Sequence, residues 1–338
     1  MKRKKKSRKI FVLFLILILG GLIFYYFNGG KEVLEKQIPK KQEVKKLKIV
    51  NEDSNERNIA VMINNHSAAN PHSGLDDAYL VYEIIVEGGL TRMMAVYKDK
   101  NTDIIGSVRS ARHYFLDYAL ENDAIYTHFG WSEKAESDIQ SLGINNINGL
   151  YDDAFWREKL NLAYEHTAFT SIDKIKELAK KKKYRLTSDD ELLLNYSVDE
   201  INLNNEENAT VANEVSIPYS YQHTTSYVYN PDTKRYLRYM NGIEHTDRIT
   251  NNQYSAKNII IAKIKNYSID SYGRQNLDNI GTGEGYYITN GYSIPITWSK
   301  SSRNSKTIYK KFNGEEIKVN DGNTYIQIEP INFEPNFS

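Results

Sequence analysis

The stretch AYLVYEIIVEGGLTRMMAVY, residues 78–97, contains two apolar segments on either side of a glycine pair. Residues 78–85 and 93–97 are short and rich in β-branched or aromatic side chains, which is typical of strands. Gly88 and Gly89, between them, permit a tight turn or a close approach of the backbone. We therefore expect two strands joined by a glycine turn.

Strand and helix patterns alternate around this pair. Residues 59–63 and 124–127 predict two further strands. An apolar helical face and serine caps predict helices at 110–122, 132–142 and 171–183. The alternation over residues 58–194 indicates an α/β domain.

Residues 223–332 have a different pattern. Turn dipeptides of the hairpin type, such as Asn241-Gly242, recur between alternating apolar residues, and no helical pattern is present. We therefore expect a mostly antiparallel β domain. The Asn- and Glu-rich residues 195–222 indicate a linker, with an edge strand around 211–217.

The N-terminus combines a basic segment with a long apolar one. Residues 1–9 are mostly Lys and Arg, and residues 10–27 are apolar apart from two glycines. A helix of this length extends about 27 Å, close to the roughly 30 Å hydrocarbon core of a bilayer. The positive flank predicts a single-pass membrane anchor with a cytoplasmic N-terminus and the remaining chain outside.

Two alternatives remain open for this region. A cleaved signal peptide has the same basic and apolar pattern, although no small-x-small cleavage site follows Tyr25. Residues 28–57 are rich in Lys and Glu and have few apolar side chains, which predicts a tether. A short helix over 31–46 is the alternative to an extended tether.

The composition excludes several classes of function. The 338 residues include 44 Lys and Arg against 43 Asp and Glu, so no overall positive field favours a nucleic-acid partner. The chain has no cysteine, which excludes disulfides, thiolate metal sites and a thiol for lipid attachment. No spacing of histidines supports a metal either, and we expect neither a metal nor a cofactor. The alternative is a metal-dependent hydrolase in which His128, His166 and a carboxylate converge in space.

A glycine and two arginines precede the helix predicted at 110–122. In the motif Gly106-Ser-Val-Arg109-Ser110-Ala-Arg112, both arginines are expected in the first helical turn, with Ser110 as a possible cap. Free backbone N–H groups and guanidinium groups together favour a carboxylate or phosphate. Arg92 carries a further positive charge nearby in the sequence. The alternative is that these arginines form structural ion pairs with acidic neighbours.

Two carboxylates and two histidines are candidate catalytic or binding groups. Glu83 and Glu87 are four residues apart on an extended segment, so we expect them on one face. Such a pair can divide acid and base roles, as in glycoside cleavage, or can simply hold arginines. His128 and His166 follow predicted strands, where ligands often bind, although such histidines are also commonly structural.

Trp156 lies in a short acidic, aromatic and basic cluster, Asp152-Asp-Ala-Phe-Trp156-Arg157. Its indole could stack on a sugar ring or could cap the core of the domain. Further along the chain, His245 and Asp247 would share one face of an extended loop.

Several motifs resemble the YerB-type lipoprotein family of Gram-positive bacteria. They are Ile59-Ala-Val-Met-Ile-Asn-Asn65, Ser73-Gly-Leu75, Glu83 to Arg92, Ile105 to Arg112, Trp298-Ser-Lys300 and Gly322 to Ile328. The resemblance covers residues 58–330 and implies two domains of unknown function on the outer face of the membrane. It supplies no catalytic residues. Members of that family are typically anchored through a lipobox cysteine, which this chain lacks, so residues 10–27 would replace the lipid.

The sequence therefore predicts a membrane-anchored, extracytoplasmic protein of the cell envelope that binds an anionic wall component such as peptidoglycan. The expected ligand-binding residues are Arg92, Arg109, Ser110, Arg112, Trp156 and His166. If the ligand is also hydrolysed, the expected catalytic residues are Glu83, Glu87 and His128. The alternative is a non-catalytic module that docks an envelope protein through the β domain.

Overall fold

The computed structural model describes residues 2–30 and 45–338, in two compact units, Met1–Lys45 and Lys46–Ser338. The first unit contains α1 (Lys2–Tyr25) and a π-helical turn (Tyr26–Gly30). The helix predicted at 31–46 and much of the expected tether lie outside the described residues.

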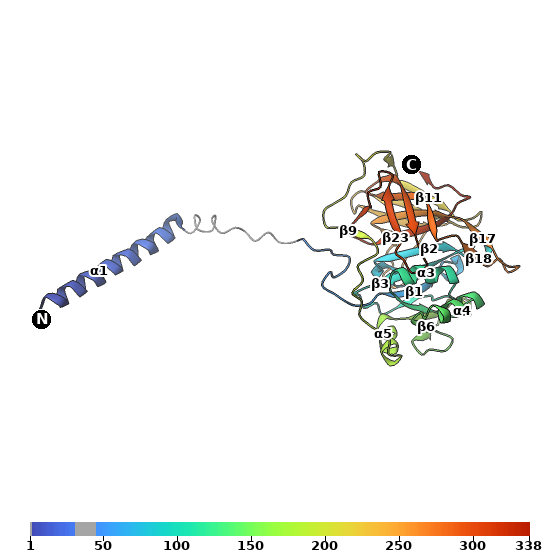
Figure 1. Cartoon of the computed structure of the whole chain (residues 1–338), viewed down its shortest axis with the longest axis horizontal. Coiled ribbons are helices and arrows are strands. Elements are labelled where there is room, and N and C mark those ends of the chain that lie inside the picture. Colours follow the sequence, from blue (N-terminus) through green and yellow to red (C-terminus); the bar gives the residue numbers. More distant parts are fainter. Residues whose placement is uncertain (1, 31–44) are drawn as a thin grey trace. The chain divides into compact units, whose positions relative to one another are not determined.

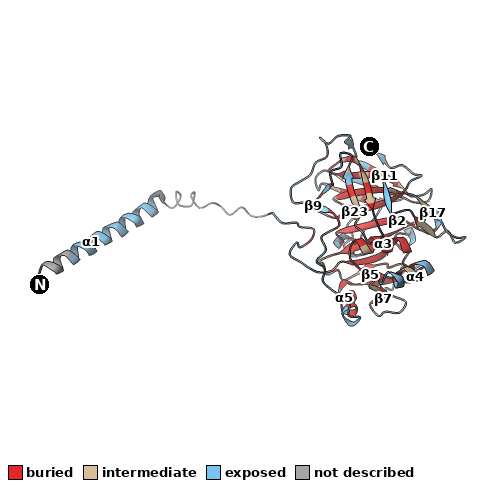
Figure 2. Cartoon of the chain, in the orientation of Figure 1, coloured by how far each residue is buried: buried red, intermediate tan, exposed pale blue. Residues whose placement is uncertain are grey.

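One helix in the described part of the chain is long and apolar enough to cross a membrane. It covers Arg8–Asn28, in agreement with the predicted span 10–27. Its large apolar side chains are exposed along the whole length (Figure 2). A single apolar helix near an N-terminus fits a membrane anchor and a signal sequence equally well.

The folded unit is built on an 11-stranded mixed sheet (Figure 1). Its strands follow the order β10-β20-β19-β16-β23-β2-β3-β1-β5-β6, and β21 pairs with β20. The N-terminal half of the unit contributes β1 (Ile59–Asn64), β2 (Leu80–Ile85), β3 (Thr91–Tyr97), β5 (Ile125–His128) and β6 (Asn146–Asn148). The later half contributes β10 (Thr210–Val211), β16 (Asn258–Ile264), β19 (Gly281–Thr289), β20 (Tyr292–Lys300), β21 (Ile308–Lys311) and β23 (Thr324–Pro330).

The two halves meet inside this sheet rather than at a linker. Strand β23 pairs in parallel with β2 on one side and with β16 on the other. All residues of β2 and β23 are buried, so each strand needs a hydrogen-bonded neighbour on both edges. The expected α/β part and the mostly antiparallel β part are both present, but they share one sheet.

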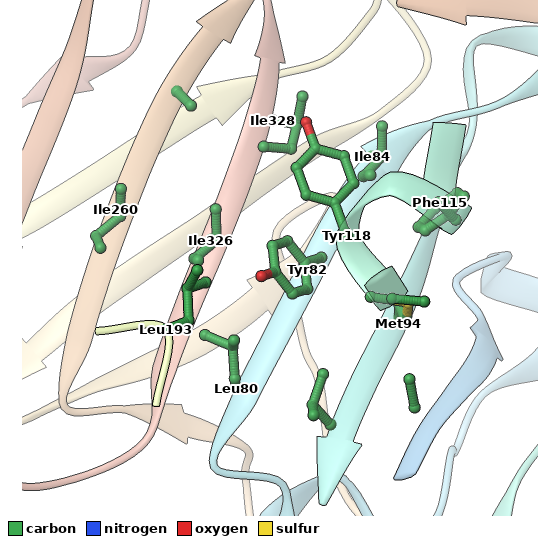
Figure 3. Close-up of a cluster of buried hydrophobic side chains, with 14 of the residues drawn as sticks. Leu80, Tyr82, Ile84, Met94, Phe115, Tyr118, Leu193, Ile260, Ile326 and Ile328 are labelled. Carbon is green, nitrogen blue, oxygen red and sulfur yellow. The ribbon is translucent and has the colours of Figure 1, made fainter. Parts of the chain in front are cut away.

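Three helices flank the sheet: α3 (His113–Glu121), α4 (Glu133–Ser141) and α5 (Ile172–Lys181). Residues of α3 pack with Tyr82, Ile84 and Met94 of the sheet in one hydrophobic cluster, where the rings of Tyr82 and Tyr118 are 4.9 Å apart (Figure 3). The predicted serine caps of α4 and α5 are confirmed, because the Ser132 and Ser171 side chains accept hydrogen bonds from backbone N–H groups in the first turn.

Helix α3 begins later than the sequence predicts. Its N-cap is Arg112, whose side chain makes no capping bond, and its first residue is His113. Arg109 and Ser110 therefore precede the helix, and neither arginine lies in its first turn. The structure thus does not place both arginines in the first turn of a helix, and an anion bound here would contact their side chains rather than a helix N-terminus.

A second sheet covers the opposite face of the first. It has the order β14-β13-β12-β11-β24, with β15 paired to β13. Its strands are β11 (Glu214–Pro218), β12 (Thr224–Asn230), β13 (Arg235–Met240), β14 (Ile243–Glu244), β15 (Ser255–Ala256) and β24 (Asn336–Phe337). Buried tyrosines of this sheet join Val81 and Ala95 in a second hydrophobic cluster, which also includes residues of α5.

Three small sheets complete the unit. They are β4 (Ile105–Gly106) with β7 (Phe155–Arg157) and β8 (Ala168–Thr170), β9 (Asn195–Ser197) with β22 (Lys318–Asn320), and β17 (Asn266–Ser268) with β18 (Gln275–Leu277). Residues 195–222, expected as a linker, thus hold β9, β10 and β11. The last of these corresponds to the edge strand expected around 211–217.

The folded unit also begins before the expected start at residue 58. The backbone N–H groups of Lys48 and Ile49 donate to the Asp321 carboxylate at 2.9–3.0 Å, and Val50 is buried. Few but well-placed apolar side chains in this segment are enough to hold it against the later half of the chain.

We predict that a chain ending at residue 194 does not fold. Removing the chain after residue 194 leaves the buried strand β2 without β23 on one edge and uncovers the face that packs against the second sheet. The measurement is urea unfolding followed by far-UV circular dichroism, with a chain ending at residue 330 as the control, because it keeps every strand of the large sheet. A cooperative transition of the 194-residue chain would contradict the prediction.

Candidate functional site

Three neighbouring parallel strands end at one edge of the large sheet. Strand β1 pairs in parallel with β5, and β5 with β6, so Asn64, His128 and Asn148 mark a common carboxyl edge. Arg92, at the start of β3, pairs with Asn64 and lies at the same edge. Ligands of α/β sheets usually bind beyond such carboxyl ends.

Arg92, Arg109 and Arg112 gather at this edge around Glu87, and we call these three side chains the arginine cluster. Arg112 donates to both carboxylate oxygens of Glu87, with Nη2 at 3.0 Å from Oε2 and Nε on Oε1. Arg92 Nη2 lies 3.6 Å from Glu87 Oε2. The glycine turn Glu87–Gly89, in which both glycines have a positive φ, places this carboxylate.

The remaining bonds of the cluster go to backbone carbonyls. Arg92 Nη1 donates to the carbonyl of Ser110 at 2.9 Å, and Arg109 Nη1 donates to that of Glu165 at 3.0 Å. Arg109 Nε is buried and, among the described residues, has no hydrogen-bond partner. Glu87 therefore pairs with Arg92 and Arg112, and Arg109 beside them retains an N–H donor without a partner among the described residues.

The electrostatics of the cluster reflect this surplus of positive charge. Burial and the neighbouring charge of Arg112 lower the pKa of Arg92 to about 9. Burial also lowers the pKa of Arg109, partly opposed by Glu165 and reinforced by Arg112. Burial alone would raise the pKa of Glu87, but the hydrogen bond and charge of Arg112 hold it below its usual range. A bound anion would relieve the mutual repulsion of the arginines.

His166 lies beside the cluster. It belongs to a 3-10 turn (Tyr164–His166), its Nδ1 accepts from Asn64 Nδ2 at 2.8 Å, and its ring stacks on His66 with centroids 5.6 Å apart. Burial and the charge of Arg109 lower the pKa of His166, which favours a neutral ring.

His128 is held in a structural position instead. The ring is fully buried, with Nδ1 2.8 Å from the carbonyl oxygen of Gly130 and Nε2 3.3 Å from Asn146 Oδ1. Burial lowers its pKa to about 4. Within the described part of the chain, its hydrogen bonds and ring contacts go to Gly130, Asn146, Tyr126 and Trp131, so the structure does not bring His128 into the arginine cluster.

The other two predicted groups also differ in their placement. Ser110 contributes its backbone carbonyl to Arg92, and its Oγ lies against Gly130. Trp156 is half-buried in β7, and its Nε1 donates to Glu158 Oε1 at 2.7 Å. Neither side chain bonds directly to a guanidinium group in the part of the chain that the structure describes.

Glu83 and Glu87 do not share a face, contrary to the sequence-based expectation. Glu83 points into the second sheet, where Arg238 Nη2 donates to its Oε2 at 2.9 Å and His223 Nε2 to its Oε1 at 3.1 Å. Glu87 pairs with Arg112, which precedes α3 on the opposite face. The extended segment ends at Ile85, so the alternation on which the expectation depended does not reach Glu87.

The surroundings of Glu83 form a buried polar network. Its carboxylate also accepts from Asn65, Thr91 and Thr225, at 2.8–2.9 Å. Burial alone would raise the pKa of Glu83, but the charge of Arg238 and the hydrogen bond from His223 hold it far below its usual range. Glu83 is therefore ionised and fully committed to these donors.

Sequence reasoning missed Arg238 and His72, which join this network to His245, a residue singled out on an expected extended loop. Arg238 Nη1 donates to His245 Nδ1, and His245 Nε2 lies 2.7 Å from His72 Nδ1. All three side chains are buried, and burial together with the charge of Arg238 lowers the pKa of His72 to about 3. The available signal was the position of Arg238 on an inward-facing site of a strand with alternating burial.

The part of the chain that the structure describes contains no group of three or more His, Cys, Asp or Glu side chains that could hold a metal ion. The chemistry available at the carboxyl edge is thus that of guanidinium, imidazole and backbone donors.

Comparison with known proteins gives matches over most of the folded unit. Residues 46–185 match the model "Protein of unknown function (DUF3048) N-terminal domain", and residues 215–326 match the corresponding C-terminal domain. A protein of Bacillus subtilis (strain 168) named "Putative lipoprotein YerB" is 34% identical over 274 residues, which cover 79% of this chain and 76% of that protein. The crystal structure of YerB protein from Bacillus subtilis superposes with a TM-score of 0.73 at 30% identity, covering 84% of this chain and 94% of the other.

The fold and these matches define an envelope-associated protein with two domains of unknown function. The chain belongs to the YerB-like family, as its sequence motifs indicated. The two matched domains correspond to the halves that share the large sheet.

We predict that Glu83→Gln lowers the free energy of unfolding at pH 7 by about 3–5 kcal/mol, because Arg238 would stay buried without its counter-charge. The folded-state pKa of Glu83 is depressed, so its contribution is present above the unfolded pKa of about 4.3 and is lost as the pH falls below it. Urea unfolding of the full chain at pH 7 and pH 4 measures both effects.

The control for this variant is Glu207→Gln, which removes an exposed carboxylate. Glu207→Gln should leave both the stability and its pH dependence near those of the wild type. Equal stability of Glu83→Gln and the wild type at pH 7 would contradict the structural role assigned to the network.

Proposed function

We propose that this protein is anchored in the cell membrane and binds an anionic component of the cell wall, such as peptidoglycan, through Arg92, Arg109 and Arg112. The observation that carries the proposal is the gathering of three guanidinium groups at the carboxyl edge of β1, β5 and β6, where, among the described residues, only those of Arg92 and Arg112 form an ion pair with Glu87. Partly buried guanidinium groups bind carboxylates and phosphates more strongly than exposed ones, since little water competes for them.

Arg109 is the group best suited to contact the ligand. The only hydrogen bond of its guanidinium group within the described residues goes to a backbone carbonyl, whereas the guanidinium group of Arg112 is occupied by Glu87. The neutral imidazole of His166 beside it supplies a further polar contact without adding charge. The site thus combines a guanidinium group that has no ion-pair partner among the described residues with a neighbouring neutral imidazole.

Hydrolysis by paired carboxylates is not part of the proposal. Glu83 is fully buried and accepts hydrogen bonds from five side chains. Glu87 is held by Arg112 with its pKa lowered, so it is a poor proton donor at neutral pH. Binding without cleavage fits both environments.

The proposed anchor is the apolar segment Arg8–Asn28. Its basic N-terminal flank supports a cytoplasmic N-terminus, with the folded unit outside the membrane. The related protein is named as a lipoprotein, but this chain has no cysteine that could carry a lipid, so a retained helix supplies the attachment.

A second candidate function is docking of an envelope protein through the later half of the chain. It is favoured by the hairpin of β17 and β18, which exposes Tyr267, Ile269 and Tyr272. Exposed apolar side chains grouped on one hairpin are typical of a small contact surface. This function requires no contact with the arginine cluster.

We predict that Arg109→Gln weakens binding of the full chain, in detergent, to purified wall sacculi by about tenfold or more, because a charge-assisted hydrogen bond is worth roughly 1.5–3 kcal/mol. Binding of the wild type should also weaken with added salt, and less steeply in the variant. Co-sedimentation over a range of salt concentrations measures both quantities.

The matched control is Arg274→Gln on the hairpin of β17 and β18, where the arginine pairs with Asp270. Removal of this guanidinium should leave sedimentation with sacculi unchanged. Equal losses in the two variants would indicate non-specific attraction, and no loss in Arg109→Gln would reject the proposed site.

A further inference from the structure

Aromatic side chains lie on both sides of the arginine cluster. On the Arg112 side, Trp131 forms a backbone bridge with Ala111, the residue directly before Arg112, and its ring packs against the hydrophobic cluster that contains Ala111. The ring of Tyr151 packs against this indole, with centroids 5.8 Å apart and planes at 43°. Tyr151 is 73% exposed, so much of its ring is uncovered.

A second aromatic group lies on the Arg109 side. The guanidinium carbon of Arg157 stands 4.0 Å from the ring centroid of Tyr164 and 4.6 Å from that of Phe129. Tyr164 is 72% exposed and directly precedes Glu165, whose carbonyl accepts from Arg109. We call Trp131, Tyr151, Phe129 and Tyr164 the aromatic platform.

The platform is fixed from below by tight packing. A Cβ atom at Gly149 would lie 2.2 Å from the ring of Phe129, so only glycine leaves room for that ring. The buried ring of His128 lies 5.5 Å from that of Trp131. His128 therefore has a positioning role under the platform, and the aromatic rings are preorganised for a ligand.

We infer that the aromatic platform stacks sugar rings and that the ligand of the arginine cluster is consequently an acidic glycan. This inference rests on the proposed function, because the same arginines would take the acidic groups. The C–H face of a pyranose ring is apolar and covers an aromatic ring, removing both from water. Its hydroxyl groups stay at the wet rim.

The placement of the rings on two sides of the charge favours a glycan over a simple anion. A free phosphate or a short acidic peptide needs only the guanidinium groups, and it would leave Tyr151 and Tyr164 uncovered. A saccharide that carries its acid between or beside two sugar rings engages both aromatic groups and the arginines at once. A glycan would therefore cover the exposed rings of Tyr151 and Tyr164, whereas a simple anion would leave them without a role in binding.

The test compares two probes that carry the same carboxylates: a disaccharide–peptide fragment of peptidoglycan, and its stem peptide freed of the disaccharide. Binding to the full chain in detergent micelles is measured by calorimetry. The wild type should bind the sugar-bearing fragment about tenfold more tightly. Tyr151→Ala and Tyr164→Ala should each weaken that fragment about threefold to tenfold and leave the stem peptide unaffected.

The matched control is Tyr272→Ala, which removes an equally exposed tyrosine from the hairpin of β17 and β18. It should change neither affinity. Because the two platform tyrosines are exposed, unchanged thermal unfolding in each variant excludes misfolding as the cause of a loss.

The outcomes separate this inference from the proposed function. Equal affinity of the wild type for the two probes, or equal weakening of both by the tyrosine variants, would overturn the sugar platform while leaving anion binding intact. Binding of neither probe, or binding that Arg109→Gln does not reduce, would overturn the proposed function and the platform with it. Loss of the sugar-dependent gain alone supports the platform.

Discussion

The buried ion pair of Glu83 and Arg238 is the constraint on which the structure depends. Both side chains are inaccessible to solvent, and they belong to different sheets, β2 and β13. Either charge alone in this position would cost about 3–5 kcal/mol, so the two sheets must pack face to face for either to be stable. The pairing of β23 with β2 inside the large sheet also joins the two halves of the chain, through backbone hydrogen bonds. The halves matched by the two family domains are consequently one packed structure.

This constraint also defines the candidate site. Glu83 holds Thr91, which directly precedes Arg92, so the buried network fixes the start of β3 from one face. The Glu87–Gly89 turn then directs a second carboxylate to the other face, where it orders Arg112. Two carboxylates that the sequence suggested as a catalytic pair therefore have separate structural tasks. Arg109, which neither of them holds, keeps one N–H donor, at Nε, without a partner among the described residues.

Local signals in the sequence were sufficient for the elements but not for their assembly. The strands around Gly88 and the caps Ser132 and Ser171 were predicted because each depends on neighbouring residues. The pairing of β23 with β2 joins residues far apart in the chain, and no local pattern encodes it. The gathering of the three arginines was anticipated from their density in the sequence. The groups that hold them in place were not anticipated: Glu87 orders Arg112, and Arg238 and His72 complete a buried network that is visible only in the fold.

The most direct test of the account is nuclear magnetic resonance of arginine side chains in the full chain, titrated with the disaccharide–peptide fragment of peptidoglycan. The account predicts that the Nε–H signals of Arg109 and Arg112 shift and saturate together, while that of the buried Arg238 stays fixed as an internal reference. Unchanged signals of Arg109 and Arg112, with shifts confined to the hairpin of β17 and β18, would contradict it and would favour the docking function.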